Sequence, residues 1–256
     1  MAACRVLVGG AVAEKPSRQV SSSDPLAVTQ PLPRFASRGG EKLDAAMENF
    51  GLEVTGKIVM DAGASTGGFT DCLLQRGASL VVAVDVGRGQ LLARLRADDR
   101  VEVMEGVNVR HLGPQDLGGR RFEFVVADLS FISLGTVAGA LVGLAQPGAD
   151  LVVLVKPQFE AGRAVVSRGK GVVRDPGTWS GALSSVATAF EGAGAGVEGA
   201  MVSPLLGARG NTEFFLHLRV RPSRLASVVD FDEVALSALS SGDALAVAPG
   251  AAGGAR

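Results

Sequence analysis

The sequence of 256 residues has no tyrosine, two cysteines, two histidines and one tryptophan. Two cysteines, Cys4 and Cys72, are too few for a disulfide framework or a zinc site, so we predict no metal site. No uninterrupted apolar run approaches the roughly 20 residues of a membrane-spanning helix. The amino terminus lacks the basic, apolar and small-residue succession of a signal peptide. We therefore expect a cytoplasmic protein with no membrane partner.

The charge balance and the length limit the remaining possibilities. A formal net charge of −1 argues against a strongly basic coat for nucleic acid, although a local basic groove is compatible with it. With 47% hydrophobic residues, a chain of this length can bury one substantial α/β core and a small appendage. The oligomeric state is not indicated by the sequence.

The first 40 residues are predicted to hold a small strand-rich unit and a linker. Gly9-Gly10 signals a hairpin turn, and Pro31 and Pro33 mark residues 31–40 as a linker. Residues 1–30 are too few for a core of their own, so this unit either packs on the rest of the chain or is half of a domain. A helix is expected from Glu41 to Phe50. The expected strands are Arg5–Val8, Ala11–Val12 and Leu26–Val28.

From residue 57 onward, strand-like and helix-like segments alternate. Apolar strands separated by helices predict a parallel sheet covered on both faces. The last two strands have only a short connection, which predicts an antiparallel edge pair and a sheet of seven strands. Residues 221–256 are rich in Ala, Gly and Ser and are expected to be a partly disordered tail. The strands are expected at Ile58–Met60, Leu80–Val84, Val101–Met104, Phe122–Ala127, Leu151–Val155, Val197–Val202 and Glu213–Val220. The helices are expected at Phe69–Arg76, Gln90–Ala97, Val137–Ala145 and 176–190.

The stretch from Lys57 to Thr70 is the most informative in the chain. A β-branched run ends in Asp61, and a glycine-rich turn then opens onto a helix, which is how open α/β sheets present backbone N–H groups to nucleotide-like ligands. A P-loop would need lysine where Phe69 stands, and Ser65 occupies the place of the second glycine of the dinucleotide motif. S-adenosylmethionine is therefore the leading candidate ligand, and a generic tight turn is the alternative.

Polar residues follow several of the predicted strands, at the edge where parallel sheets bind ligands. Asp85 lies near the offset expected of an acid that hydrogen-bonds ribose hydroxyls, although a solvated strand end would look the same. Asn108 is equally compatible with an adenine contact and with a turn. Lys156 directly follows a buried strand and needs a carboxylate such as Asp128. This pair is either a structural ion pair or a lysine held over a methyl donor.

Six segments together resemble the hemolysin A (TlyA-type) ribosomal RNA methyltransferases, from about Arg5 to Val220. They are Ser37-Arg-Gly-Gly-Glu-Lys-Leu43, Asp61-Ala-Gly-Ala-Ser-Thr-Gly-Gly-Phe-Thr70, Asp85-Val-Gly, Ala127-Asp-Leu-Ser-Phe-Ile-Ser133, Val155-Lys-Pro-Gln-Phe-Glu160 and Gly210-Asn-Thr-Glu-Phe-Phe215. The resemblance implies an FtsJ-like domain over residues 41–220, with the seven-stranded Rossmann-like sheet of S-adenosylmethionine-dependent methyltransferases. It also implies methylation of cytidine ribose 2′-hydroxyls in ribosomal RNA or ribosomal subunits.

The resemblance also implies functional residues. The family's catalytic tetrad falls on Lys42, Asp128, Lys156 and Glu213. Lys156 would be the general base or the group that steers the attacking oxygen, with the carboxylates orienting the lysines and Lys42 holding the ribose or a phosphate. The residues expected to bind the cofactor are Asp61, Gly63, Ala64, Ser65, Thr66, Gly67, Gly68, Phe69, Asp85, Asn108 and Asp128.

RNA recognition is expected at two basic clusters and in the first unit. The family begins with an RNA-binding domain of a ribosomal-protein type, of which only the strand-rich second half is recognisable here, in residues 1–30. Phosphate contacts are predicted from basic residues beside the linker and in a glycine-rich loop, although the loop could be merely solvated. The residues concerned are Arg34, Arg38, Arg163, Arg168, Lys170 and Arg174.

Three other functions are compatible with parts of the sequence. A nicotinamide-dependent oxidoreductase would share the sheet and Asp85, but it gives no reason for Lys156 and Glu213 to converge. A noncatalytic RNA-binding protein would fit the incomplete first unit. A membrane-lytic hemolysin is disfavoured because the sequence shows no basic amphipathic helix with a large apolar face.

Overall fold

The computed structural model describes residues 6–13, 18–28, 33–162, 169, 171–207, 209–221 and 229–245. They belong to two units, Met1–Arg34 and Phe35–Arg256. The boundary falls inside the predicted linker, and the second unit begins with Phe35, whose ring is buried.

The first unit contains a three-stranded antiparallel sheet in the order β2-β1-β3. Its strands are β1 (Val6–Val8), β2 (Ala11–Val12) and β3 (Leu26–Val28), so the three predicted strands are confirmed. Gly9 and Gly10 both have positive φ, at 60° and 81°, as a tight hairpin turn of this handedness requires. Arg18 donates from Nη1 to the carbonyl of Val12 at 2.9 Å and so stabilises the hairpin.

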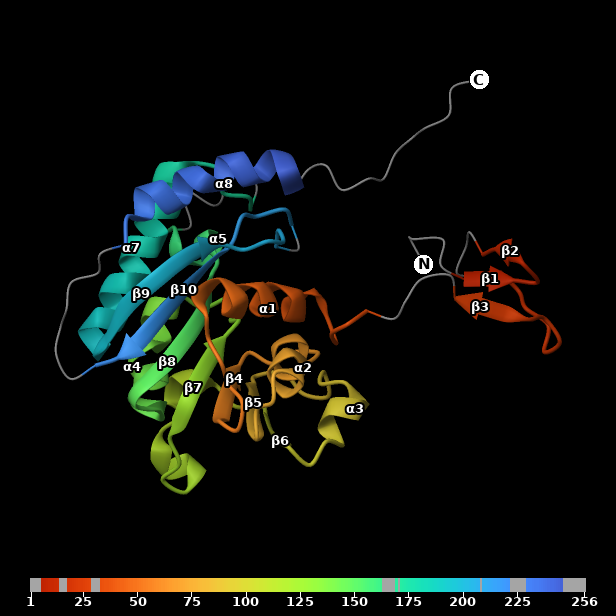
Figure 1. Cartoon of the computed structure of the whole chain (residues 1–256), viewed down its shortest axis with the longest axis horizontal. Helices are drawn as coiled ribbons and strands as arrows, with labels where there is room; N and C mark the ends of the chain where they lie inside the picture. The colour runs from red at the N-terminus through yellow and green to blue at the C-terminus, as the bar shows by residue number, and fades with distance from the viewer. Residues whose placement is uncertain are drawn as a thin grey trace. The chain divides into compact units, whose positions relative to one another are not determined.

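The second unit is built on a seven-stranded sheet in the order β6-β5-β4-β7-β8-β10-β9 (Figure 1). The five strands from β6 to β8 are parallel, and β10 runs antiparallel to β8 and β9. This confirms the predicted α/β sheet with an antiparallel edge pair. The strands are β4 (Ile58–Ala62), β5 (Leu80–Asp85), β6 (Val101–Glu105), β7 (Phe122–Ala127), β8 (Ala145–Val155), β9 (Ala195–Val202) and β10 (Phe214–Val220).

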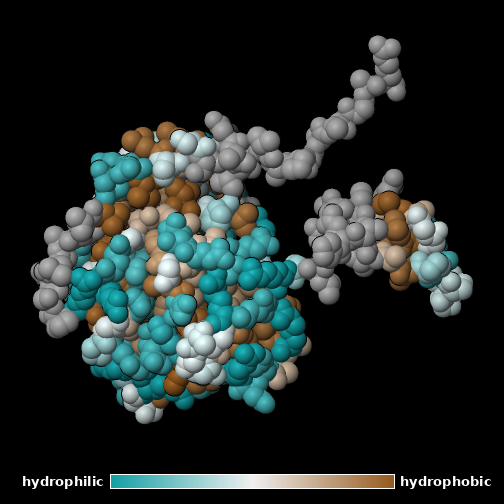
Figure 2. Space-filling view, in the orientation of Figure 1, coloured by the Kyte–Doolittle hydropathy of each residue, from teal (hydrophilic) through white to brown (hydrophobic). Residues whose placement is uncertain are grey.

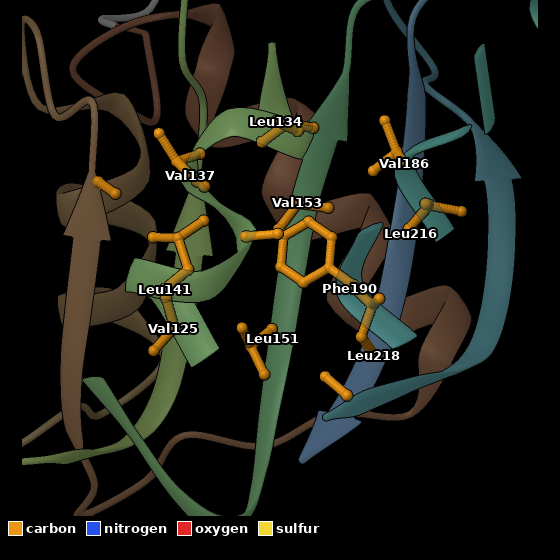
Figure 3. Close-up of a cluster of buried hydrophobic side chains, with 14 of the residues drawn as sticks. Val125, Leu134, Val137, Leu141, Leu151, Val153, Val186, Phe190, Leu216 and Leu218 are labelled. Atoms are coloured by element: carbon orange, nitrogen blue, oxygen red, sulfur yellow. The ribbon is translucent and has the colours of Figure 1, made fainter. Parts of the chain in front are cut away.

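Helices cover both faces of this sheet because alternate strand residues point to opposite faces. One buried cluster lies between the sheet and α1, α2 and α3. The other joins the sheet to α4, α7 and α8, and Figure 3 shows Phe190 of α7 beside Val153 of β8 and Leu141 of α4 beside Val125 of β7. Hydrophilic residues cover most of the visible face of the unit (Figure 2). The helices are α1 (Arg38–Phe50), α2 (Gly68–Gln75), α3 (Ala93–Arg96), α4 (Leu134–Leu144), α5 (Pro157–Glu160), α7 (Pro176–Ala193) and α8 (Phe231–Leu245), with 3₁₀ turns η1 (Val109–His111) and η2 (Pro114–Leu117).

Helix α1 begins earlier than the sequence indicated. It starts at Arg38, inside the predicted linker, because the Ser37 hydroxyl accepts a hydrogen bond from the Gly39 amide at 3.2 Å and caps the first turn. Helix α3 is shorter than the predicted helix over 90–97 and has no side-chain cap.

Helix α8 lies in the segment that was expected to be a tail. Asp230 accepts hydrogen bonds from the amides of Asp232 and Glu233 at its start, and Ala235 and Ala238 are buried in the core. A local cap and a face of small side chains thus form a helix where the composition suggested none. The prediction of disorder at 246–256 lies outside the described residues.

Candidate active site

Two adjoining pockets lie at the carboxyl ends of the parallel strands, where α/β sheets bind ligands. The first, here called the α1 pocket, has a volume of about 500 Å³ and is lined in part by Arg38 and Lys42 of α1. The second, here called the β5 pocket, has about 540 Å³ and is lined in part by Asp85 of β5 and by Asn108. Both are lined by Gly63, Ser65, Asp128, Ser130 and Phe131.

The glycine-rich turn between β4 and α2 forms part of both pocket walls. Gly63 has φ of 90° and its amide donates to the Val84 carbonyl at 2.8 Å. A Cβ atom at Gly63 would lie 2.5 Å from the backbone oxygen of Asp128, so only glycine fits there. Ser65 also has positive φ, at 47°, which is uncommon for a residue with a side chain. Of the predicted cofactor residues in this turn, Gly63, Ala64, Ser65, Thr66, Gly68 and Phe69 line the α1 pocket.

Asp61 and Gly67 lie behind this turn, and the structure does not bring them to the wall of either pocket. Asp61 is fully buried, and the Thr70 hydroxyl donates to its Oδ2 at 2.7 Å. Burial, together with the smaller effect of the negative charges of Asp128 and Asp85, raises the pKa of Asp61 to about 7. A Cβ atom at Gly67 would meet the side chains of Leu91 and Leu95. Both residues therefore shape the turn from its buried side.

Asp85 and Asn108 line the β5 pocket and also hold backbone. Asp85 accepts hydrogen bonds from the amides of Ser65 at 2.8 Å and Gly87 at 2.7 Å. Its carboxylate therefore links the end of β5 to the glycine-rich turn. Asn108 accepts from the Arg110 amide at 3.0 Å and caps η1, so the predicted turn role is confirmed. A contact between Asn108 and adenine stays a prediction.

Lys156 and Asp128 form an ion pair between the ends of β8 and β7. The Lys156 ammonium lies 2.5 Å from Oδ1 of Asp128 and donates to the Ser130 hydroxyl at 2.9 Å. Only 9% of the Lys156 residue is exposed. The expectation that a buried strand-end lysine needs this carboxylate is thus confirmed. Because Asp128 lines both pockets, the pair lies at their junction.

A second ion pair joins α1 to the segment before β10. The Lys42 ammonium donates to Oε2 of Glu213 at 2.5 Å, and both side chains are buried. Gly207 makes room for this carboxylate, since any Cβ atom at Gly207 would run into it. All four residues of the expected tetrad therefore line one pocket.

Several pocket residues were not identified from the sequence. Phe131 is 92% exposed with φ of 67°, and its ring centroid lies 5.3 Å from that of Phe159, which also lines the α1 pocket. Arg209 and Asn211 line the same pocket. Phe131, Phe159 and Asn211 lie in segments that carry the family resemblance, but nothing in their residue types distinguishes a pocket residue from a core one.

Glu160 lies outside the lining of the α1 pocket and links two helices beside it. It accepts hydrogen bonds from the Ser133 hydroxyl at 2.6 Å and the Leu134 amide at 2.8 Å. These bonds tie α5 to the amino terminus of α4. Burial raises the pKa of Glu160 above its ordinary value.

Of the predicted RNA-binding residues that the structure describes, only Arg38 lines the α1 pocket. Arg38 is exposed and lines the α1 pocket, and Arg174 is exposed outside its lining. Arg34 belongs to the first unit, and Arg163, Arg168 and Lys170 lie outside the described residues. Among the residues that the structure describes, no group of three His, Cys, Asp or Glu side chains could hold a metal. No described helix is both long enough and apolar enough to cross a bilayer.

Comparison with known proteins agrees with this geometry. The family model of the FtsJ-like methyltransferases matches residues 35–220. The chain is 47% identical to the 16S/23S rRNA (cytidine-2′-O)-methyltransferase TlyA of Mycobacterium tuberculosis, over 93% of this chain and 88% of that protein. It is 37% identical to Hemolysin A of Brachyspira hyodysenteriae, over 85% and 89% of the two chains. A solved structure described as "Putative hemolysin from Streptococcus thermophilus" superposes with a TM-score of 0.82 at 39% identity, covering 95% of this chain and 89% of that one. The chain therefore belongs to the FtsJ-like methyltransferase family and, within it, to the hemolysin A (TlyA-type) proteins.

Proposed function

We propose that this protein transfers a methyl group from S-adenosylmethionine to ribose 2′-hydroxyls of cytidines in ribosomal RNA. The observation that carries the proposal is the position of two lysine–carboxylate ion pairs on one pocket that shares a wall with a second. The Mycobacterium tuberculosis relative is named for this reaction. The shared wall would bring a donor in the β5 pocket next to an acceptor in the α1 pocket.

The lining of the β5 pocket fits S-adenosylmethionine chemically. Asp85 offers carboxylate oxygens to ribose hydroxyls, and within the described lining the charged residues, Asp85 and Asp128, are both acidic. Such a lining favours a ligand with positive charge. Gly63 lets the turn approach the end of β7 closely. When bound there, S-adenosylmethionine would supply a methyl carbon made electrophilic by its positively charged sulfur.

Lys156 is the residue that we place closest to the acceptor oxygen. An ammonium group has three N–H donors, and the contacts with Ser130 and Asp128 leave one of them for a ligand. A 2′-hydroxyl that accepts this hydrogen bond would be held in one orientation, as an in-line displacement requires. The hydroxyl must lose its proton as the bond from the methyl carbon to sulfur breaks and the bond to oxygen forms. We assign that proton to the Lys156–Asp128 pair at the junction of the pockets, whose carboxylate can accept it.

The Lys42–Glu213 pair is proposed to hold the rest of the acceptor ribose. Because α1 and the segment before β10 meet through this pair, it also fixes the width of the α1 pocket. Residues 1–30 and the basic residues Arg34, Arg38, Arg163, Arg168, Lys170 and Arg174 are proposed to contact RNA. Phosphate contacts of this kind would orient the RNA without reading its sequence.

The proposal is tested by methyl transfer to ribosomal subunits that lack the modification. The wild-type protein with S-adenosylmethionine should add 2′-O-methyl groups to cytidines, as mapped by mass spectrometry of the ribosomal RNA. Lys156→Ala should reduce the rate by about 100-fold or more, the scale of a lost acid–base or orienting group. Its affinity for S-adenosylmethionine, measured by calorimetry, should stay near that of the wild type.

The matched control is Lys57→Ala, a lysine that precedes β4 and lies outside the lining of both pockets. It should methylate at the wild-type rate. Wild-type protein that binds S-adenosylmethionine but modifies no ribosomal RNA would overturn the proposed substrate. Full activity of Lys156→Ala would overturn the role of the lysine.

A further inference from the structure

The lining of the α1 pocket has more positively charged than negatively charged side chains. It includes four cationic side chains, of Arg38, Lys42, Lys156 and Arg209, and two carboxylates, of Asp128 and Glu213. Each lysine is matched by one carboxylate at 2.5 Å. The excess positive charge of the pocket therefore belongs to the two arginines, in a chain whose net charge is −1.

These two arginines differ from most others in the second unit. Seven arginines contact a carboxylate: Arg76, Arg94, Arg96, Arg100, Arg120, Arg219 and Arg221. Within the described part of the chain, no carboxylate lies within ion-pair distance of Arg38 or Arg209, and both are exposed. Their guanidinium groups are thus available to an anionic ligand.

The backbone that carries Arg209 is fixed by its neighbours. The Gly210 amide donates to Gly207 and the Gly207 amide donates to Asn211, both at 2.9 Å, which closes a tight turn. The buried Asn211 side chain accepts from the Val173 amide and donates to the Gly171 carbonyl, each at 2.9 Å. A Cβ atom on Gly171 would lie 3.5 Å from Nη1 of Arg209, which places the guanidinium beside this glycine.

Arg38 reaches the same pocket from α1. It precedes Lys42 by one helical turn and so lies on the same face of the helix. Lys42 in turn binds Glu213, which follows the Arg209 turn by a few residues. The Lys42–Glu213 pair therefore brings the two arginines to one pocket from two different elements.

We infer that Arg209 and Arg38 form a phosphate subsite for the RNA backbone next to the acceptor ribose. The inference rests on the proposed function and extends it to the ligand groups that the pocket recognises. In RNA, the carbon that bears the 2′-hydroxyl is bonded to the carbon that bears the 3′-phosphodiester. A 2′-hydroxyl held at Lys156 thus brings a phosphate with it. Guanidinium groups donate paired hydrogen bonds to phosphate oxygens. Arg38 and Arg209 can therefore bind this phosphate.

The experiment measures equilibrium binding of a ribosomal RNA transcript at increasing KCl concentrations, together with methyl transfer to that transcript. Arg209→Ala should weaken binding about tenfold and should reduce the salt slope by about one, as the loss of one phosphate contact predicts. Arg209→Lys should bind with intermediate affinity because it keeps the charge and loses the paired hydrogen bonds. The affinity for S-adenosylmethionine should not change in either variant, which also verifies that they fold.

Arg121→Ala is the matched control, because Arg121 is an exposed arginine at the opposite end of β7. It should bind RNA like the wild type. An unchanged affinity and salt slope for Arg209→Ala overturns the phosphate subsite, and methylation by the wild type shows that the proposed function survives that result. A wild-type protein that neither binds the transcript nor methylates ribosomal subunits overturns both.

Discussion

Lys42 and Glu213 lie 171 residues apart in the sequence and form a buried ion pair at 2.5 Å. Lys42 lies on α1, before the first strand of the large sheet, and Glu213 directly precedes its last strand in sequence, β10. Only 7% of Lys42 and 4% of Glu213 is exposed. The pair therefore fixes α1 across the carboxyl end of the sheet and closes one side of the α1 pocket.

Removing one partner of this pair should cost stability as well as activity. Glu213→Gln would leave the Lys42 ammonium buried without its counter-charge, and such losses typically lower the free energy of unfolding by about 3–5 kcal/mol. The double variant Lys42→Met with Glu213→Gln should recover part of this loss, since no buried charge is left. Urea unfolding measures both values. A single variant that unfolds at the wild-type urea concentration would show that the pair does not stabilise the fold.

Gly63→Ala should damage the junction of the two pockets. The added Cβ atom would lie 2.5 Å from the Asp128 carbonyl at a φ of 90°, so the turn must shift and the strain should cost about 1–3 kcal/mol. We expect weaker binding of S-adenosylmethionine by calorimetry. Gly139→Ala is the control, because Gly139 lies in α4 with nothing within 4 Å of its Cβ position. It should raise the free energy of unfolding slightly and leave binding unchanged. Equal affinities for the two variants would contradict the assignment.

Most of the sheet and the ion pair at Lys156 could be predicted from the sequence. β-branched runs separated by helices define the parallel strands, and polar residues at their ends must meet at one edge of the sheet. The need of Lys156 for a carboxylate followed from burial alone. The pairing of Lys42 with Glu213 could not be predicted in this way, because it depends on how α1 packs across the sheet.

Other features depend on backbone geometry that residue types do not reveal. The positive φ of Phe131 brings an aromatic ring into solvent, whereas a phenylalanine is usually predicted to be buried. Asp61 lies one residue before the end of β4, whereas Asp85 is the last residue of β5. Successive strand residues face opposite sides of the sheet, and the Asp61 side chain is buried on a side that a helix covers. Arg209 lies at the pocket because of the turn fixed by Asn211.

The buried carboxyl group of Asp61 should make stability depend on pH. Its pKa is about 7 in the folded protein and 3.8 in a model compound, so the folded state binds the proton more tightly than the unfolded one. The stability from this group is fully present below pH 4 and is lost as pH rises through 7. Asp61→Asn keeps an acceptor for Thr70 and cannot ionise. Between pH 5 and pH 8, its free energy of unfolding should therefore rise relative to that of the wild type, by a few kcal/mol at most. Parallel pH profiles in urea unfolding would contradict this prediction.

Phe131 should matter for methyl transfer and not for folding. Its ring is 92% exposed, lines both pockets and packs on the ring of Phe159, so it offers an aromatic face to a nucleobase. Stacking of a base on an aromatic ring contributes about 1–3 kcal/mol, so Phe131→Leu should raise KM for the RNA substrate by about tenfold or more.

The stability of the same variants separates this role from a structural one. Leucine keeps the left-handed backbone strain, so Phe131→Leu should unfold at the wild-type urea concentration. Phe131→Gly should unfold at an equal or higher one, because glycine adopts this φ without strain. If Phe131→Leu lost stability in proportion to its loss of activity, the ring would be holding the pocket together. An unchanged stability with a raised KM means that the exposed ring contacts the RNA substrate.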